Sequence, residues 1–440
     1  MTSEWPVVTV GEMCTLVTKG TTPTTVGFGF ENHGVNFVKV ESITEDGAFV
    51  PGKLMRISQA AHEALSRSKL HEGDVLFTIA GTIGRTAIVP DSLLPANTNQ
   101  AVAIARPNTS RVLPRFLRYV LSNPAFTISA TSRTVQSVQA NFSLAELKGS
   151  RVNLPRIAEQ KVIVGMLGAL DDRIALLRET NATLEAIARA LFKSWFVDFD
   201  PVRAKQQGLA LAGMDEATAA LFPAGFEDSA LGLVPKGWSV QPVGLAVECV
   251  GGATPDTKEP DYWSPEEHAW TTPKDLSGLP SPVLLGTERR LSTKGLAKIG
   301  SGLLPVGTLL MSSRAPIGYL AIAQVPVAIN QGYIAMPPGG VLPPLYLLFW
   351  CQQNMEIIKA RANGSTFMEI SKKAFRPIPA LVPPAQMIAA FEDVASPLFA
   401  RIVENERQAQ TLATLRDTLL PRLMSGQLRL PEAEPVLETV

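Results

Sequence analysis

The chain carries one sequence pattern twice, and this repeat limits the folds that it can adopt. Residues 5–11, Trp-Pro-Val-Val-Thr-Val-Gly, are echoed by residues 238–244, Trp-Ser-Val-Gln-Pro-Val-Gly. Each copy continues to a Thr-Pro pair and then to an Asn-Gln pair; these are Thr22-Pro23, Asn99-Gln100, Thr254-Pro255 and Asn330-Gln331. The matched positions lie much further apart than the roughly 20 to 50 residues of a solenoid repeat. The sequence therefore predicts a tandem duplication of a globular module.

Each copy ends in a long segment with residues spaced alternately four and three apart, the pattern of a coiled-coil seam. The seam positions are Leu170, Ile174, Leu177, Asn181, Leu184, Ala188, Leu191 and Trp195 in the first copy, and Leu398, Ile402, Asn405, Ala409, Leu412, Arg416, Leu419 and Leu423 in the second. Neither helix can bury its stripe alone, so we expect the two to pair. Asn181 and Asn405 lie on the seams, where a polar residue fixes register at a cost in stability. Alternatively, each helix packs on its own module as an ordinary amphipathic helix.

Within the modules, short β-rich runs separated by Gly, Pro and Asn predict strands, and residues 114–122 and 344–360 predict helices. The fold class is therefore α+β, with two mixed α/β modules in tandem, each followed by a long helix. The helices are expected to pair as an antiparallel coiled coil with pseudo-twofold symmetry. The predicted divisions are residues 1–150 and 238–376 for the modules, 151–206 and 377–440 for the helical regions with the tail, and 207–237 for the connector.

Composition narrows the class of protein. Hydrophobic residues make up 46% of the 440 residues, but no apolar run approaches the ~20 residues of a membrane helix. The first residues lack the pattern of a signal peptide, and the three cysteines have no metal-type spacing, so a soluble cytoplasmic protein is expected. Lys plus Arg and Asp plus Glu are both 40, so the net charge is zero. This balance argues mildly against a stand-alone nucleic-acid binder, which usually has a basic excess.

Motifs that would indicate catalysis are missing from the sequence. It has no Gly-x-x-x-x-Gly-Lys-Ser/Thr phosphate loop and no Gly-rich cofactor loop after a long strand. The four histidines show no ligand spacing and no match between the copies, so no metal site is predicted. The repeated residues are Gly, Pro, Asn-Gln and apolar side chains, which build a scaffold. The sequence therefore predicts a non-catalytic protein with no cofactor of its own.

Several stretches resemble a known family. Residues 191–201, Leu-Phe-Lys-Ser-Trp-Phe-Val-Asp-Phe-Asp-Pro, and residues 419–428, Leu-Leu-Pro-Arg-Leu-Met-Ser-Gly-Gln-Leu, resemble the ends of the two conserved regions of type I restriction-modification specificity subunits. Residues 270–276, 312–318, 330–332 and 364–370 are further matches in family order, so the resemblance spans nearly the whole chain.

The resemblance implies that each module is a target recognition domain reading one half of a bipartite sequence in double-stranded DNA. The paired helices would act as a spacer and dock two methyltransferase subunits, and restriction/translocase subunits would join the complex. S-adenosylmethionine, ATP and Mg would then belong to the partner subunits, which would carry the adenine-N6 methyltransferase and ATP-dependent endonuclease activities. Residues 80–84 of the first copy differ from residues 313–318 of the second, which implies an asymmetric target.

Two alternatives remain at this point. One is a scaffold that joins protein partners without contacting DNA, and the other is the specificity component of a related nuclease-methyltransferase system. A salt-dependent gel shift would separate the scaffold from a DNA reader.

Reading bases requires side chains that reach the groove edges, typically Lys or Arg to guanine and Asn or Gln to adenine. The candidates are Lys19, Thr21, Thr22, Arg133, Thr134 and Gln136 in the first module, and Lys258, Tyr262, Lys274, Arg314, Ser365, Lys372 and Lys373 in the second. The Asn-Gln pairs recur although the two half-sites would differ. We therefore expect these pairs to cap a turn in each module rather than to select bases.

Overall fold

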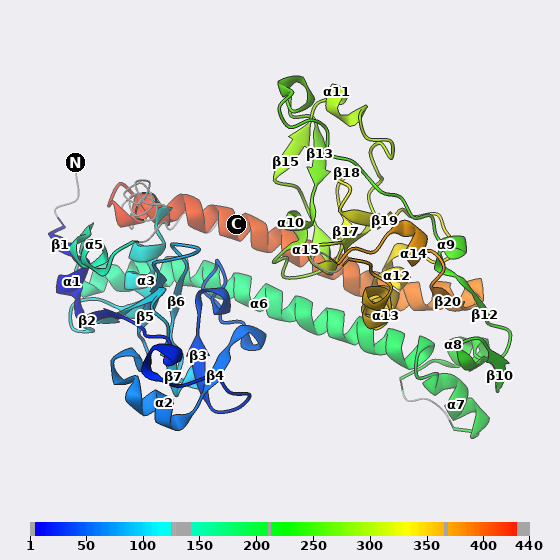
Figure 1. Ribbon diagram of the computed structural model, residues 1–440, viewed down its shortest axis with the longest axis horizontal. Helices are drawn as coiled ribbons and strands as arrows, with labels where there is room; N and C mark the ends of the chain where they lie inside the picture. The colour runs from blue at the N-terminus through cyan, green and yellow to red at the C-terminus, as the bar shows by residue number, and fades with distance from the viewer. Residues whose placement is uncertain are drawn as a thin grey trace. The chain divides into compact units, whose positions relative to one another are not determined.

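A computed structural model describes residues 5–124, 126, 128, 142–209, 213–364 and 368–428. The chain forms two compact units, one of residues Met1–Arg173 with Thr411–Val440, and the other of residues Ile174–Gln410. Two long helices, α6 (Ile157–Phe196) and α15 (Ala385–Met424), contribute residues to both units (Figure 1).

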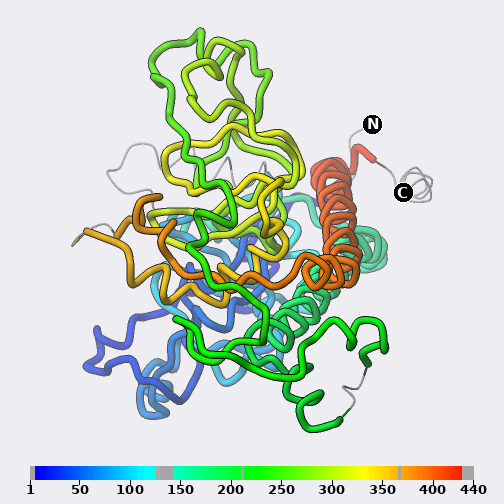
Figure 2. The backbone as a smooth tube through the Cα atoms, turned by 90° about the vertical axis from the view of Figure 1, so that its right-hand side faces the viewer, coloured from blue at the N-terminus to red at the C-terminus, as the bar shows by residue number. Residues whose placement is uncertain are grey.

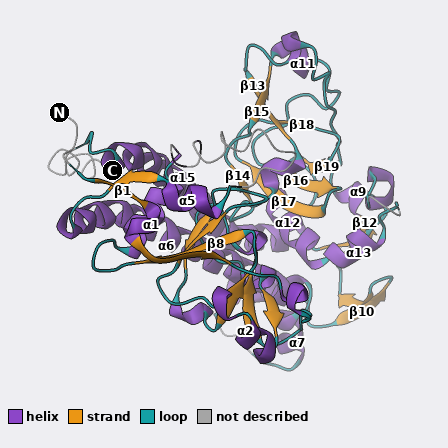
Figure 3. Cartoon of the chain, turned by 60° about the vertical axis from the view of Figure 1, so that its left-hand side comes forward, coloured by secondary structure: helices purple, strands orange, loops and turns teal. Residues whose placement is uncertain are grey.

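The module of the first unit contains two principal sheets. The four-stranded sheet is antiparallel throughout, in the order β2 (Cys14–Lys19), β8 (Val102–Pro107), β5 (Val75–Thr78) and β6 (Thr86–Ile88). In the three-stranded sheet, β3 (Val35–Val38) lies between antiparallel β4 (Met55–Ile57) and parallel β7 (Ala96–Thr98). The helices are α1 (Val10–Met13), α2 (Gln59–Ala64), α3 (Pro114–Ser122) and α5 (Leu144–Gly149). Figure 3 shows these strands in orange.

The module of the second unit also contains a four-stranded and a three-stranded sheet, but its four-stranded sheet includes one parallel pair of strands. Its four-stranded sheet has the order β14 (Val283–Leu284), β17 (Ile317–Ala323), β16 (Leu309–Ser313) and β19 (Tyr333–Met336). Its three-stranded sheet places β13 (His268–Thr271) between antiparallel β15 (Arg289–Leu291) and parallel β18 (Ala328–Ile329). The helices are α9 (Val243–Ala246), α10 (Pro273–Leu276), α11 (Thr293–Leu296), α12 (Pro344–Gln353), α13 (Met355–Ala360) and α14 (Lys372–Phe375).

The topology confirms the predicted duplication. In each three-stranded sheet, the central strand has one antiparallel and one parallel neighbour. Each module also joins its first strand to its last, because β1 (Val7–Thr9) pairs with β9 (Arg151–Asn153), and β12 (Ser239–Pro242) pairs with β20 (Pro379–Val382). Both closing strands lie just beyond the module ends expected at 150 and 376. The divisions drawn from the sequence otherwise remain predictions.

The long helices pair as the seam predicted. Within the second unit, Asn181 of α6 bonds to Asn405 and Glu406 of α15, while Phe192, further along α6, stacks against Phe391 near the start of α15. Later residues of one helix therefore meet earlier residues of the other, so the pairing is antiparallel. The seam residues Leu170, Ile174, Leu177, Trp195, Ile402, Leu412, Leu419 and Leu423 are buried, and Leu184, Leu191 and Leu398 are half-buried.

Polar groups on the seam have partners. Asn405 Nδ2 donates to Asn181 Oδ1 at 2.8 Å, and Asn181 Nδ2 donates to Glu406 Oε1 at 2.8 Å. In the first unit, Arg416 Nη1 of α15 donates to Asp171 Oδ1 of α6, also at 2.8 Å. Asp171 Oδ2 accepts from the hydroxyl of Tyr119 at 2.8 Å and lies 3.2 Å from an Arg118 nitrogen, so this carboxylate joins α3 to both long helices.

The last turns of α6 also pack on the second module. Phe192 and Phe196 contact Tyr346 of α12 with ring centroids 4.9 and 5.0 Å apart, and both contact Phe391. The sequence left two alternatives, that α6 pairs with the other long helix or that it packs on a module. In this unit α6 does both.

One expectation needs correction. The helix expected over residues 344–360 is interrupted at Asn354, where α12 ends and α13 begins. A short helix, α7 (Asp200–Gln206), precedes the connector, and the connector itself contains α8 (Glu216–Leu221) and a hairpin of β10 (Phe226–Ser229) and β11 (Gly232–Pro235). Phe222 and Val234 are buried in the core of the second unit. Figure 2 follows this segment in green.

Candidate nucleic-acid interface

The same polar turn occurs in both modules. Asn99 Oδ1 accepts a hydrogen bond from the backbone N–H of Ala101 at 3.2 Å, and Asn330 Oδ1 accepts one from Gly332 at 2.8 Å. An Asn side chain that binds the backbone two residues later forms an Asx turn. The predicted turn-capping role of the Asn residues agrees with this geometry.

Each turn is tied to the loop that carries the repeated Thr-Pro pair. The Thr254 hydroxyl donates to Gln331 Oε1 at 2.6 Å, and Thr22 makes the same bond to Gln100 in the first module. Thr22 was predicted to contact a base, but its hydroxyl proton is used within the protein.

Close backbone contact explains the glycine that precedes each Thr-Pro pair. A Cβ atom on Gly20 would lie 1.9 Å from the carbonyl oxygen of Thr98, and one on Gly252 would lie 1.8 Å from that of Ile329. Any larger residue at either position would collide with the neighbouring backbone. The loop and the Asn-Gln turn are therefore held together in the same way in both copies.

The predicted base-reading residues of the first module divide into two groups. Lys19 is exposed at the end of β2, and Thr21 and Thr22 follow it in the loop. Arg133, Thr134 and Gln136 lie outside the described residues, as does Ser365 of the second module. The structure thus brings together Lys19, Thr21 and Thr22 beside the Asn99-Gln100 turn.

Several predicted cations of the second module already have acidic partners. Lys274 Nζ lies 2.7 Å from Glu288, whose hydrogen bond raises the pKa of the ammonium, and Arg314 lies 3.6 Å from Glu369. Both pairs would have to open before either residue could reach a base. Lys258 is exposed in the loop before the 3₁₀ turn η6 (Pro260–Tyr262), and Lys372 and Lys373 are exposed at the start of α14.

An aromatic and cationic cluster covers the three-stranded sheet of the second module. The Arg289 guanidinium lies 3.5 Å from the ring centroid of Trp263 and 5.4 Å from that of Trp270. Lys298 Nζ lies 5.4 Å from the Tyr262 ring, one of the predicted contact residues. Arg289 and Lys298 were not among the predicted contact residues, because they are distant in sequence from these rings and reach them only in the folded chain.

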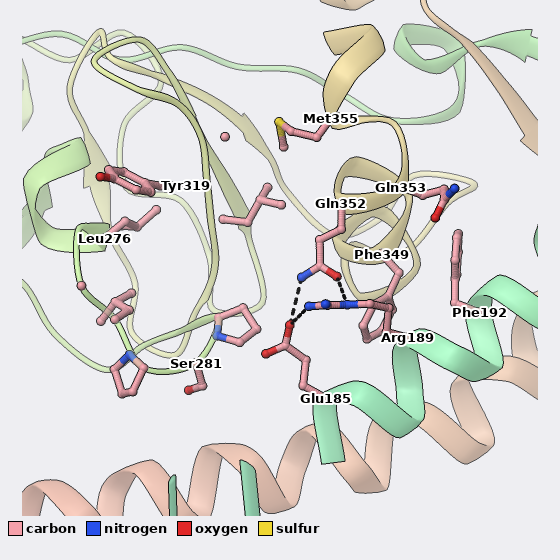
Figure 4. Close-up of a pocket in the computed structure, with 16 residues that line it drawn as sticks. Glu185, Arg189, Phe192, Leu276, Ser281, Tyr319, Phe349, Gln352, Gln353 and Met355 are labelled. Atoms are coloured by element: carbon pink, nitrogen blue, oxygen red, sulfur yellow. Dashed lines mark hydrogen bonds and ion pairs between the residues drawn. The ribbon is translucent and has the colours of Figure 1, made fainter. Parts of the chain in front are cut away.

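A cavity of about 490 Å³ lies in the second unit between α6 and the module (Figure 4). Three of its polar side chains bind one another: Arg189 Nε donates to Gln352 Oε1 at 3.0 Å, and Gln352 Nε2 donates to Glu185 Oε1 at 3.1 Å. Glu185 also accepts from Arg189 at 2.5 Å. This three-residue network fixes α12 on α6, so it positions the second module on the helix.

The three cysteine thiols share one electrostatic property. Burial raises the pKa of the Cys14 thiol to about 12 and also raises the pKa values of the Cys249 and Cys351 thiols, which disfavours the reactive thiolate. Within the described ranges, no group of three or more His, Cys, Asp or Glu side chains is arranged to hold a metal ion. In the same ranges, no helix is long and apolar enough to cross a membrane.

Comparison with known proteins identifies the family. The model of the type I restriction modification DNA specificity domain matches residues 2–186 and 235–393, which together make up most of the chain. The chain therefore belongs to the type I restriction-modification specificity family, as the resemblance in its sequence indicated.

Similar proteins include the HindI type I restriction enzyme specificity subunit of Haemophilus influenzae, 27% identical over 409 residues that span 82% of this chain and 88% of that protein. The MjaIX specificity subunit of Methanocaldococcus jannaschii is 34% identical over 185 residues, 42% of each chain. The solved S subunit of a type I system from M. genitalium has a TM-score of 0.48 at 14% identity, covering 96% of both chains. The HsdS subunit from Thermoanaerobacter tengcongensis has a TM-score of 0.37 at 19% identity, covering 96% of this chain and 97% of that one.

Proposed function

We propose that this chain is the non-catalytic, sequence-specific DNA-binding subunit of a type I restriction-modification complex. Each module reads one half of an asymmetric bipartite target, with Lys19 and Thr21 as contact candidates in the first module and Lys258, Tyr262, Lys372 and Lys373 in the second. The observation that carries this proposal is the repeated topology, in which one frame presents different loop side chains in its two copies. Two methyltransferase subunits and the restriction subunits supply the catalysis with their own S-adenosylmethionine, ATP and Mg.

Exchanging one module tests whether each module recognises its half-site independently of the other. Replacing residues 1–150 by the equivalent module of a family member should change one half of the methylated motif and leave the other half intact, because each module has its own sheets and core. The measurement is genome-wide mapping of modified adenines after co-expression with the cognate methyltransferase subunit in a methylation-free host. The matched control exchanges residues 238–376 and should change the opposite half. A simultaneous change in both halves would contradict independent reading.

The paired helices are proposed to set the spacing between the half-sites. A heptad inserted after Ala182, with a matching heptad in α15 at the level of Asn405, lengthens the seam by about 10 Å. We expect the same two half-sites with a spacer about three base pairs longer, because base pairs rise about 3.4 Å. A seven-residue insertion between Ala230 and Leu231, in the β10–β11 turn, is the control and should leave the spacer unchanged. An active double-insertion variant that keeps the original spacer would show that the helices do not determine it.

The docking of methyltransferase subunits requires an accessible surface. The seam residues proposed for this role are buried or half-buried between the helices, so the partner would contact the outward faces. Leu176 and Ile187 of α6 are 52% and 50% exposed. Eleven residues make about three helical turns, so both lie on one face of α6. We assign the docking contact to this face.

A further inference from the structure

Each module presents a set of hydrogen-bond donors that its internal structure does not use. Backbone N–H groups occupy the Oδ1 atoms of Asn99 and Asn330, and threonine hydroxyls occupy the Oε1 atoms of Gln100 and Gln331. In the part of the chain that the structure describes, no hydrogen bond uses the amide nitrogens of these four side chains. Gln100 and Gln331 are exposed. The oxygens are therefore held inward, and the NH₂ groups remain as donors.

A lysine accompanies this turn in both modules, although it comes from different parts of the chain. In the first module, Lys19 directly precedes Gly20. The matching position in the second module is Gly251, and a Cβ atom there would lie 3.2 Å from Nζ of Lys372. Lys372 thus occupies the space beside the turn that a side chain at position 251 would take. Each module therefore has a lysine next to this turn, Lys19 through the chain sequence and Lys372 through the fold.

The two half-sites of an asymmetric target differ in base sequence, but both have the same sugar-phosphate backbone. A donor set present in both modules therefore fits the common feature of the two half-sites. Phosphate oxygens accept hydrogen bonds from Asn and Gln amides and pair with lysine, and such contacts fix the register of a protein on DNA without reading sequence. The loops that differ between the modules would then select the bases.

We propose that each turn is a phosphate clamp that binds one DNA phosphate. The clamp consists of Asn99, Gln100 and Lys19 in the first module and of Asn330, Gln331 and Lys372 in the second. It rests on the proposed function, since it assumes that the modules bind DNA. It also separates Lys19 and Lys372 from the base-reading residues, because their contacts are the same for every sequence.

The test uses isosteric substitutions in the full chain, in complex with the cognate methyltransferase subunit. Gln100→Glu and Gln331→Glu keep the oxygen that accepts from threonine, but they replace the outward donor by an anionic oxygen. Each should weaken binding about tenfold or more, both to a duplex that carries the methylated motif and to one with shuffled sequence, because a hydrogen bond to a charged group is lost. The motif mapped by adenine methylation should stay the same. Gln206→Glu adds the same charge in α7, which contributes no residue to either turn, and should bind as the wild type does.

The lysines give a second readout. Lys19→Ala and Lys372→Ala should each reduce the slope of log affinity against log salt by about one, as expected for the loss of one phosphate contact. Glutamate variants that bind like the wild-type complex would overturn the clamp, leaving the Thr-Gln bond as a structural tie. If a variant complex methylates a motif that differs at one base, the residue contacts that base, and the phosphate clamp is overturned. A wild-type complex that binds neither duplex would overturn the proposed function as well, so the two failures are distinguishable.

Discussion

Replacing Asp171 by alanine is expected to lower the free energy of unfolding by about 3–5 kcal/mol, the usual cost of removing one partner from a buried ion pair. The Asp171 side chain is 13% exposed, and that of Arg416 is 18% exposed. Without the carboxylate, the Arg118 and Arg416 guanidinium groups and the Tyr119 hydroxyl lose a shared acceptor. Urea unfolding followed by circular dichroism would measure the loss.

The neighbouring residue provides a matched control for Asp171. Asp172 also pairs with an arginine of α3, Arg115, but its side chain is 63% exposed. Solvent screens such a pair, so Asp172→Ala should cost no more than about 1 kcal/mol. Equal losses for the two alanine variants would show that the buried network does not stabilise the first unit.

Truncation of the aromatic cluster should have an effect of similar size in the second unit. Phe391 is fully buried and contacts Phe192, Trp195, Phe196 and Tyr346 with ring centroids 5.3 to 6.3 Å apart. Phe391→Ala is expected to cost about 3–5 kcal/mol, since both the transfer energy of the ring and a cavity term are lost. Because this cluster fixes the end of α6 on α12, hydrogen exchange should also accelerate in both helices.

Val394 lies one turn further along α15 and is 47% exposed. Val394→Ala should change the free energy of unfolding by about 0.5 kcal/mol or less, as surface substitutions usually do. If Phe391→Ala were as mild as this control, α15 would not depend on the aromatic cluster for its packing.

Features of the fold with a regular sequence period could be predicted. The 4-3 spacing led to both long helices and placed Asn181 and Asn405 on the seam, where they bond to each other. Glu406 was missed, because the heptad places it beside the seam, and only the contact with Asn181 accounts for its burial. The break at Asn354 was missed for a similar reason, since residues 344–360 are helix-compatible throughout and tertiary packing decides where one helix ends.

In the candidate interface, the features present in both modules could be predicted from the sequence. The matched Asn-Gln pairs indicated a turn, and the Asx geometry at Asn99 and Asn330 agrees with it. The position of Lys372 beside Gly251 could not be inferred, because over a hundred residues separate them and only one module uses this arrangement. Likewise, the ion pair between Lys274 and Glu288 forms because the folded chain brings Glu288 back to Lys274. No local sequence pattern predicts this contact.

The seam also makes the two halves of the chain complementary to each other. When the repeats are matched from Leu170 and Leu398, Asp171 corresponds to Phe399, and Arg416 corresponds to Ala188. The seam asparagines are also unmatched, since Asn181 corresponds to Ala409 and Asn405 corresponds to Leu177.

Two copies of α6 paired with each other would therefore set Asp171 against alanine and Asn181 against leucine, and two copies of α15 would leave Arg416 against phenylalanine. A buried charge or amide without its partner is costly. Two separately expressed halves, cut within the connector, would accordingly select one another over their own kind. The two helical segments have thus diverged so that each pairs better with the other than with a copy of itself.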